Sequence, residues 1–344
     1  ARTALYAASP LFNSHQEGSQ GYKELWYRAA KANKELIETC EDAGMRLIDD
    51  YENLWDAKSY SIAIDELIFG CRAIRATNSF EKYNFPVGLE NCRGGNCPTQ
   101  TLVDAYELKD SGERPDKKAD YDKNKPYYEG RDPRFEKTIA KNGDTKWPNW
   151  NETALETYQG GANAEPLSGG TPTGYYLKKY CQTSINTTTA KPTTDNHTWI
   201  IYRLGEFYLN YAEALFKYLG TAYATNNEFP IPANEMVSKT RRRTKVNMPK
   251  FPAGLDNKLW WEKYQNERMV ELAFEGHRFW DVRRWKEGDK HFSSIDEMKI
   301  YKSGDSYSYR RVTVNRQWDD KMYFFPIPQS EKAKNPNLTQ NPGW

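Results

Sequence analysis

The sequence predicts a mainly α-helical protein with a long loop-rich region and a few short strands, and three observations support this. Apolar residues recur at helical spacing in three long stretches, residues 22–47, 199–219 and 259–285. Gly, Pro, Asn and Thr are frequent between residues 77 and 198, where periodicity is weak. Strand-like alternation is confined to short stretches. The chain therefore divides into a helical segment (1–76), a loop-rich region (77–198) and a helical C-terminal region with an extended tail (199–344).

Composition excludes several functional classes. Charged residues make up 28% of the 344 residues, yet the net charge is only +2, whereas a dedicated nucleic-acid binder is expected to be basic. No run of about 18 apolar residues occurs, so no segment is expected to span a membrane. Aromatic residues reach 14%, with 11 Trp and 24 Tyr, so many rings must be partly exposed. Exposed rings usually mark a ligand or partner surface.

The first segment begins unusually and is predicted to contain one helix and one short strand. Residues 1–10 have helical composition but no Met, no capping residue and no signal peptide. Because a chain rarely begins inside a helix, we expect that residues upstream are missing, together with any targeting signal. A helix over residues 22–47 is predicted by the spacing of Leu25, Ala29, Ala32, Leu36, Cys40 and Met45. Alternation of apolar residues predicts a short strand within residues 65–75.

The C-terminal region is predicted to contain a helical hairpin and a longer, bent helix. The Leu204-Gly205-x-x-Tyr208 pattern within residues 199–219 resembles the start of a tetratricopeptide helix. A second helix over residues 234–246 would complete a tetratricopeptide-like pair. The third helix, residues 259–285, is expected to bend near Gly276, since Gly weakens a helix interior. Short strands are expected at 309–315 and 322–325, and the tail 326–344 is expected to lie extended over the body.

The segment 267–285 combines a ladder of charges with large apolar side chains. Its charged residues follow one another at helical i+3 or i+4 spacing: Arg268, Glu271, Glu275, Arg278, Asp281 and Arg284. One hypothesis makes Glu267, Glu271 and Glu275 acid/base groups of an active site. We favour an ion-paired scaffold helix, because every carboxylate has an arginine within one turn and an unpaired buried charge is costly.

Cysteines and histidines give no metal signature. Cys92 and Cys97 bracket a flexible Arg-Gly-Gly-Asn loop that could close into a disulfide, or all five cysteines could be free thiols. The cysteine spacing fits no zinc pattern, and the four histidines form no His-x-x-x-His pair. We therefore expect neither a metal site nor a cofactor.

An ordered series of motifs lies at residues 98–107, 131–135, 174–180, 203–214, 267–285, 325–331 and 335–344. Together these motifs resemble the RagB/SusD family of outer-membrane nutrient-binding lipoproteins. They extend over nearly the whole chain. Family chains are longer at the N-terminus, where they carry a signal peptide and a lipid-bearing cysteine, which agrees with the expected missing front end.

The resemblance implies a surface-exposed lipoprotein of the cell outer membrane that binds oligosaccharide or polysaccharide without catalysis. It would deliver the glycan to a SusC-like TonB-dependent outer-membrane transporter, with the tetratricopeptide-like helices supporting that partner and the loop-rich region holding the sugar. Membrane contact would come only from the lipid anchor in the missing part. Alternatives are a peptide-binding subunit of the same kind of import complex, a glycoside hydrolase with two facing carboxylates, and a protein-interaction module.

Flat rings for stacking and polar side chains for hydroxyl groups are what a sugar site requires. Trp147, Asn149 and Trp150 form the first candidate patch, where Pro148 stiffens the link between the rings. The further candidates are Tyr127, Tyr128, Tyr158, Phe80 and Tyr83, with Trp55 behind them. We expect Trp147→Ala or Trp150→Ala to weaken glycan binding without unfolding the protein. The alternative is that both rings pack against the helical body.

Two further groups are expected to be structural. Residues 131–134 (Arg-Asp-Pro-Arg) could form a polar clamp for a ligand, but a turn whose arginines tie loops together is favoured. The tryptophans on helical stretches are expected in the core: Trp26, Trp260, Trp261, Trp280 and Trp285.

Overall fold

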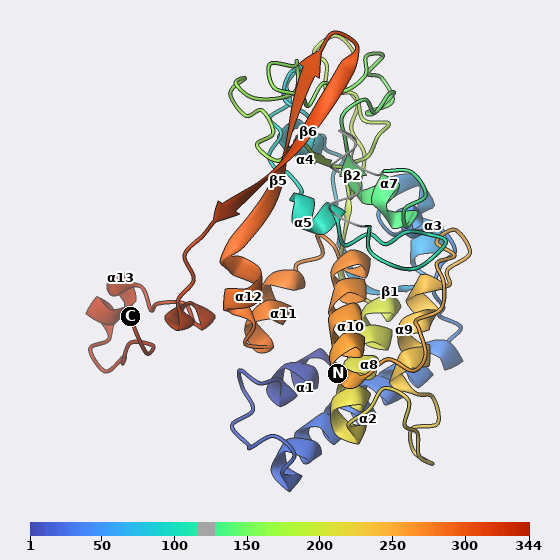
Figure 1. The fold of residues 1–344 in the computed structure, drawn as a ribbon, viewed down its shortest axis with the longest axis vertical. Helices are drawn as coiled ribbons and strands as arrows, with labels where there is room; N and C mark the ends of the chain where they lie inside the picture. Colours follow the sequence, from blue (N-terminus) through green and yellow to red (C-terminus); the bar gives the residue numbers. More distant parts are fainter. Residues whose placement is uncertain (116–127) are drawn as a thin grey trace.

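The computed structural model describes residues 1–115 and 128–344 and has the predicted mainly helical fold (Figure 1). Long helices occupy the lower half in Figure 1, and the loop-rich region with its short elements lies above them. The helices of the lower half are α1 (Arg2–Ala8), α2 (Gln20–Asp42), α8 (Leu204–Leu219), α9 (Ala233–Arg241), α10 (Asn257–Glu271), α11 (Arg278–Arg284) and α12 (Gly288–Phe292).

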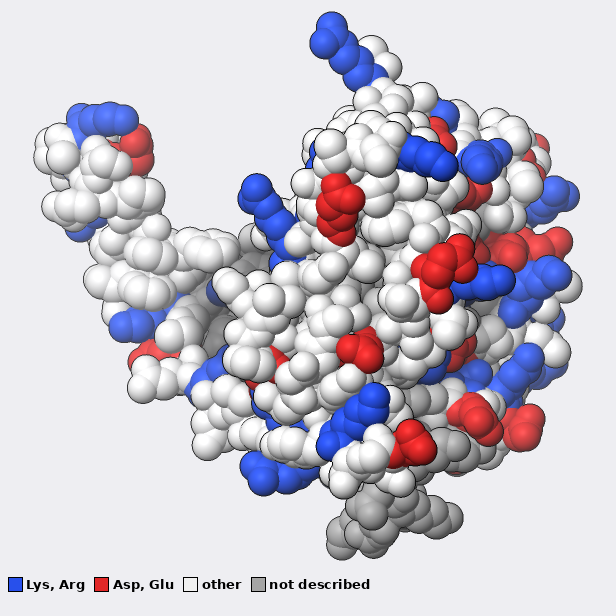
Figure 2. Space-filling model, turned by 90° about the horizontal axis from the view of Figure 1, so that it is seen from above, with Lys and Arg blue, Asp and Glu red and all other residues white. Residues whose placement is uncertain are grey.

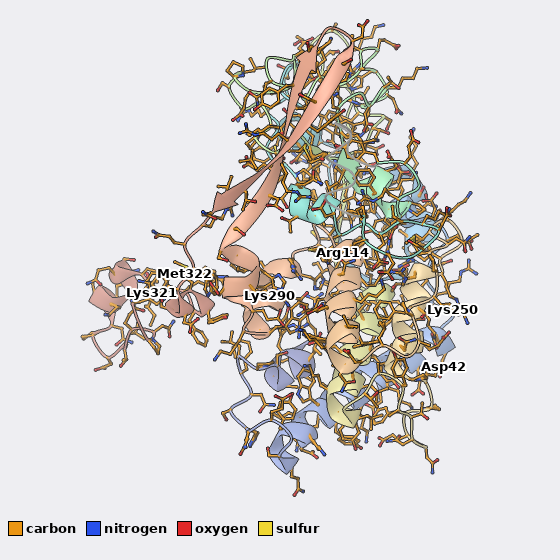
Figure 3. All side chains as sticks on the ribbon, in the orientation of Figure 1. Asp42, Arg114, Lys250, Lys290, Lys321 and Met322 are labelled. Carbon is orange, nitrogen blue, oxygen red and sulfur yellow. The ribbon has the colours of Figure 1, made fainter. Side chains whose placement is uncertain are left out.

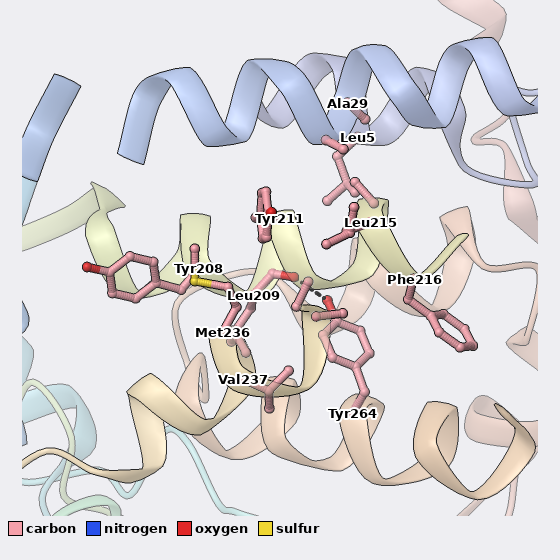
Figure 4. Packing of buried hydrophobic residues seen from close by; sticks show 14 of the residues in the cluster. Leu5, Ala29, Tyr208, Leu209, Tyr211, Leu215, Phe216, Met236, Val237 and Tyr264 are labelled. Carbon is pink, nitrogen blue, oxygen red and sulfur yellow. Dashed lines mark hydrogen bonds between the residues drawn. The ribbon is translucent and has the colours of Figure 1, made fainter. Parts of the chain in front are cut away.

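The helical scaffold is built around α8. Its two ends are defined by Arg203, where the chain is still extended, and by Gly220, whose φ of 77° ends the helix in the left-handed conformation that glycine allows. Residues 204–216 are all buried, because α2, α9 and α10 pack around them. Figure 4 shows Leu209 and Leu215 of α8 in this core, between α2 and the α9–α10 side. The α8–α9 pair is the predicted tetratricopeptide-like hairpin.

Short elements make up most of the loop-rich half and the C-terminal end. The short α-helices are α3 (Tyr60–Ala63), α4 (Ser79–Asn84), α5 (Gln100–Val103), α7 (Arg134–Thr138) and α13 (Gln329–Lys334). The 3-10 helices are η1 (Tyr51–Leu54), η2 (Ala57–Ser59) and η3 (Asp320–Tyr323). Three buried clusters organise this half, and one of them gathers Phe85, Trp147, Leu155 and Tyr176.

The described residues form three antiparallel strand pairs, of which the first two join segments distant in sequence and the third is a hairpin. The pairs are β1 (Leu67–Arg72) with β4 (Thr198–Arg203), β2 (Ile139–Ala140) with β3 (Tyr176–Leu177), and β5 (Ser294–Ser303) with β6 (Ser306–Asn315). β1 confirms the predicted strand at residues 65–75. The prediction that the helix begins at Trp199 was wrong, because Thr-Trp-Ile-Ile-Tyr is β-branched and aromatic and pairs with β1, with Gly70 opposite Ile200.

The C-terminal end differs from the sequence prediction in three ways. Residues 322–325 are not a strand, since the Asp319 side chain caps the 3-10 helix η3 by accepting from the Lys321 N–H. The tail contains α13 and projects from the helical body instead of lying over it (Figure 1). Trp280 is not in the core: it is 49% exposed beside the Phe325 ring, whereas Trp26 and Trp260 are fully buried as predicted.

The bend predicted near Gly276 is a complete break between α10 and α11. Phe274 and Gly276 have φ angles of 60° and 80°, so the chain leaves the helical conformation over residues 272–277. A left-handed conformation costs a non-glycine residue about 1–2 kcal/mol, so the surrounding structure must hold Phe274 in place.

A buried ion network holds this break and much of the fold. The Glu271 carboxylate, fully buried, lies 2.7 Å from a nitrogen of Arg134, 2.7 Å from one of Arg203 and 2.9 Å from one of Arg243. Burial alone would raise the pKa of Glu271, but the three guanidinium groups outweigh it and hold the pKa well below its usual range. The favoured hypothesis of an ion-paired scaffold is therefore confirmed.

The partners of the ladder are not those that helical spacing suggests. Glu267 pairs with Arg134 at 2.7 Å and with Arg241 at 2.9 Å, and both arginines lie outside the ladder. Only Asp281 finds partners within the segment, Arg268 at 2.7 Å and Arg284 at 2.9 Å. The network thus ties α10 to α7, more than 100 residues earlier in the chain, and to the end of α9.

We predict that Glu271→Gln lowers the free energy of unfolding by about 3–5 kcal/mol, because it leaves three buried guanidinium groups short of a counter-charge. Urea unfolding followed by circular dichroism measures the change. Glu38→Gln is the matched control: Glu38 pairs with Lys34 at 2.7 Å but its side chain is 54% exposed, so the change should stay within about 0.5 kcal/mol. Equal effects of the two substitutions would contradict the structural role of the network.

A second prediction concerns the stability of the fold at acid pH. Burial raises the pKa of Glu275, but Arg203 and Lys179 outweigh it and lower the pKa from 4.5 to about 2. A carboxyl whose pKa is lower in the folded state stabilises the fold above pH 4.5 and loses that contribution as pH falls toward 2, here roughly 3 kcal/mol. Stability measured between pH 5 and 3 should therefore fall less steeply in Glu275→Gln than in the wild type. Parallel curves would refute this assignment.

Candidate functional site

An aromatic cleft of about 230 Å³ lies where four segments of the loop-rich half meet the α10–α11 break. Its walls are Phe80 of α4, Asn96, Leu177 and Tyr180 beside β3, Trp199 and Ile200 of β4, and Phe274 and Glu275 of the break. Four of the eight lining residues carry rings, two are aliphatic, and Asn96 adds an exposed amide. This combination of flat apolar surface and few polar groups is typical of a small-molecule site.

Trp199 is the central ring of the cleft. Its centroid lies 4.8 Å from that of Phe80, in an edge-on arrangement, and 5.3 Å from that of Tyr180. The His197 ring stacks 5.8 Å from the same indole. His197 is fixed in turn by Glu81, whose carboxylate lies 2.9 Å from His197 Nε2. Trp199 is therefore half-buried and supported by its neighbours, which limits its motion.

Phe274 stands at the edge of the cleft in the left-handed conformation already described, with 38% of its surface exposed. The next residue, Glu275, is anchored by Arg203 at 2.7 Å and by Lys179 at 2.7 Å. Glu275 therefore fixes the backbone beside Phe274, and the ring stays partly in solvent. Strained backbone that presents an exposed ring is a feature found at binding sites.

Asn96 supplies an exposed amide to the cleft, and its Nδ2 donates to Asn84 Oδ1 at 2.5 Å. An amide carries both donors and acceptors, so it suits a ligand rich in hydroxyl groups.

Three of the aromatic residues predicted from the sequence lie in or beside the cleft. Phe80 lines it, and Tyr83 follows on the same short helix with 53% of its surface exposed, against the backbone of Gly95. Trp55 is buried, with its ring centroid 6.1 Å from that of Tyr180, so it supports the cleft wall from behind.

The first candidate patch from the sequence, around Trp147, lies in the neighbouring Phe85 cluster. Trp147 is 6% exposed and meets Phe85 edge-on at 5.4 Å, so its ring is buried, but within the loop-rich half and not against the helical body. The expectation that Trp147→Ala does not unfold the protein therefore conflicts with this packing. Trp150 is half-buried and donates its indole N–H to the Ile185 carbonyl at 2.8 Å, and Asn149 is exposed.

Tyr128 and Tyr158, two of the remaining predicted residues, lie outside the cleft. Tyr128 stacks on Phe135 with 5.8 Å between centroids, and its hydroxyl lies 2.8 Å from that of Tyr175. Tyr158 lies 5.7 Å from the Tyr307 ring, on the β5–β6 side. Tyr127 lies outside the residues that the structure describes.

Sequence reasoning missed Tyr180, Trp199 and Phe274 as cleft residues. Trp199 was assigned to a helix, although its β-branched neighbours favoured a strand. No local pattern indicates Phe274, because its exposure depends on a backbone conformation fixed by distant charges.

The acid/base hypothesis for the ladder finds no support in the geometry. The carboxylates of Glu267, Glu271 and Glu275 are buried and paired, and their arginine partners outweigh burial and lower all three pKa values. These groups stay ionised at neutral pH, so none of them can donate a proton as a general acid.

The other sequence hypotheses can be placed as well. Arg134 reaches Glu267 and Glu271 from the predicted turn, and Arg131 donates to the Tyr106 carbonyl at 2.7 Å, so these arginines tie segments together as favoured. All five cysteines are free thiols. Among residues 1–115 and 128–344, no three His, Cys, Asp or Glu side chains form a metal-binding group.

The surface and helices of the described residues agree with the composition. Lys and Arg alternate with Asp and Glu on the face seen from above in Figure 2, as the small net charge indicates. In the part of the chain that the structure describes, each helix is too short or too polar to cross a bilayer.

Residues 66–344 match the profile of the SusD family. A solved SusD-like protein from Bacteroides fragilis shares 24% identity with a TM-score of 0.73, over 98% of this chain and 68% of that chain. A SusD-like carbohydrate binding protein from the same species shares 23% identity with a TM-score of 0.66, over 98% of this chain and 69% of that chain. A SusD homolog from Bacteroides thetaiotaomicron shares 19% identity with a TM-score of 0.60, over 100% of this chain and 62% of that chain.

A search among curated proteins gave no match. The solved structures share the helical fold of this chain, and the family profile covers far more than half of its length. The resemblance found in the sequence motifs is thereby confirmed, and the chain belongs to the SusD family.

Proposed function

We propose that this protein binds an oligosaccharide or polysaccharide at the cell surface and passes it, without catalysis, to a SusC-like TonB-dependent outer-membrane transporter. The observation that carries the proposal is the aromatic cleft around Trp199, Phe80 and Phe274 in a chain of the SusD family. One solved structure of the same fold is described as a carbohydrate binding protein, which supports the choice of ligand.

The lining of the cleft suits a sugar ring. Sugars present C–H faces bordered by hydroxyl groups, and a supported indole with two flanking rings offers those faces a flat apolar surface. The Asn96 amide is exposed beside these rings and can exchange hydrogen bonds with hydroxyl groups. The Glu275 side chain is 1% exposed and paired with Arg203 and Lys179, so it holds the cleft wall in place and leaves the hydroxyl contacts to Asn96.

The cellular setting of the proposal follows from the family. A lipid anchor in a segment preceding residue 1 would hold the protein on the outer membrane. The tetratricopeptide-like helices α8 and α9, away from the loop-rich half in Figure 1, would support contact with the transporter. Trp150 and Asn149 stay in the proposal as a second contact surface, because part of each side chain faces solvent.

An oligosaccharide array run beside a peptide mixture tests the ligand class. We expect binding to a restricted set of glycans, and no new reducing ends when those glycans are incubated with the protein. Binding to peptides alone would replace the proposal with peptide import, and release of reducing ends would replace it with hydrolysis. Capture of a TonB-dependent transporter from solubilised outer membranes by the tagged protein tests the delivery step.

Removing the Phe274 ring should weaken binding of the glycan that the array identifies by about three- to tenfold, the worth of one aromatic contact. Two substitutions separate the ring from the backbone. Phe274→Gly and Phe274→Ala both remove the ring, but glycine adopts the left-handed conformation freely, so the Gly variant should be about 1 kcal/mol more stable than the Ala variant. Calorimetry and urea unfolding measure the two quantities. Wild-type affinity in both variants would remove Phe274 from the site.

The two tryptophans of the neighbouring cluster should behave differently from each other. Trp147→Ala empties a buried position and should cost about 3–5 kcal/mol of stability. Trp150→Ala removes a half-buried ring and one hydrogen bond, so it should leave the protein folded while weakening glycan binding by about threefold. Thermal unfolding and calorimetry on both variants check this, and unchanged affinity in folded Trp150→Ala would leave the cleft as the whole site.

A further inference from the structure

A second, larger hollow of about 590 Å³ lies between α10, α12 and the loop that leads to residue 115. We call it the arginine pocket, and it is lined in part by Arg114, Asn266, Arg278, Lys290 and His291. Figure 3 labels two of these residues, Arg114 above the upper end of α10 and Lys290 on α12. The residues that line it differ from those of the aromatic cleft.

Arg278 is a guanidinium inside the fold without a carboxylate partner among the described residues. Its Nη1 is buried and has no hydrogen-bond partner, and its Nη2 lies 3.2 Å from His291 Nδ1. Burial lowers its pKa to about 10, even though Asp281 and Glu287 act in the opposite direction. By contrast, the buried Arg134, Arg203 and Arg284 each form ion pairs. A buried cation left in this state is destabilising unless something else compensates it.

His291 does not supply that compensation. Its Nε2 lies 2.9 Å from Glu287 Oε2, while its Nδ1 faces Arg278. Burial, with the Arg278 charge, outweighs Glu287 and lowers the pKa of His291, so the ring is neutral at pH 7. The neutral ring then donates to Glu287 from Nε2 and accepts from Arg278 at Nδ1, which leaves the guanidinium charge in place.

Arg114 brings a second guanidinium to the same hollow. Its Nη2 donates to Asn266 Oδ1, and within the described residues it forms no ion pair. Three carboxylates also line the hollow: Glu107, Glu113 and Glu262. Lys263 lies 3.0 Å from Glu107 and 3.5 Å from Glu113, and Glu107 also pairs with Arg241, so two of the three already have cationic partners.

We propose that the arginine pocket binds the carboxylate of an acidic sugar, a uronic acid residue of the imported glycan. This inference rests on the proposed function and adds to it the class of substrate. A guanidinium presents parallel N–H groups that match the two oxygens of a carboxylate. The hollow is larger than a bare anion requires, and Leu255, Leu259 and Met269 offer apolar contacts to the C–H groups of a sugar ring.

Three small probes separate the chemistry: D-glucuronate, D-glucose and acetate, each titrated by calorimetry at one fixed ionic strength. Glucuronate differs from glucose by the carboxylate, and acetate carries the carboxylate without the ring. We expect glucuronate to bind at least about tenfold tighter than either, the worth of one charge-assisted hydrogen bond. Glucose binding as tightly as glucuronate would overturn the proposal. Acetate binding as tightly as glucuronate would also overturn it, because the pocket would then hold an adventitious ion only.

Variants of the pocket locate the binding. Arg114→Gln removes an exposed guanidinium with little risk to folding, and Arg278→Lys keeps the charge while removing the planar fork. Each should weaken glucuronate binding by about tenfold. Arg310→Gln, an exposed arginine of β6, is the matched control for net charge and should bind as the wild type does. Wild-type affinity in the folded Arg114→Gln variant would overturn the assignment.

The test also distinguishes this inference from the proposed function. Phe274→Gly alters the aromatic cleft and should leave glucuronate affinity unchanged. If the glycan found on the array still binds through the cleft while glucuronate does not bind at all, the arginine pocket is wrong and glycan import stands. If glucuronate binding is lost in Phe274→Gly, its site is the cleft, and the arginine pocket is wrong as well.

Discussion

The buried ion network around Glu271 is the constraint on which the rest of this structure depends. Moving charges out of water costs several kcal/mol for each ion, and the cost is offset only when partners arrive with good geometry. Arg134, Arg203 and Arg243 all meet this one carboxylate, at distances of 2.7 to 2.9 Å. Because these arginines come from the loop-rich half, from the β4–α8 junction and from the chain after α9, one centre fixes three distant segments against α10.

The same network determines where the aromatic cleft can form. Arg203 reaches both Glu271 and Glu275, so the end of α10 and the break that follows it are held from the β4 side. β4 also carries Trp199, four residues before Arg203. The central ring of the cleft and the strained backbone at Phe274 are therefore positioned by a shared anchor, which explains how an exposed ring keeps a defined place without a core of its own.

Sequence reasoning succeeded where a local pattern carries the information. Helical spacing located α2, α8 and α10, and the Gly276 position marked the break, because these features depend on residues close in sequence. It failed where long-range contacts decide. Trp199 lies in a strand because β1, more than 120 residues earlier, pairs with it. Trp147 looks like an exposed stacking ring in its loop, but Phe85 buries it, and no local pattern shows that contact.

The break between α10 and α11 has a consequence for ligand recognition. In one continuous helix, Phe274 and Arg278 would stand at i and i+4 and share a face. The left-handed conformations at Phe274 and Gly276 remove that relation, and the two side chains line different hollows instead. A segment of five residues can thus contribute an apolar ring to one candidate site and a cation to another. A glycan with neutral and acidic residues would need both kinds of contact, and the two proposed sites would supply them from the two ends of this one segment.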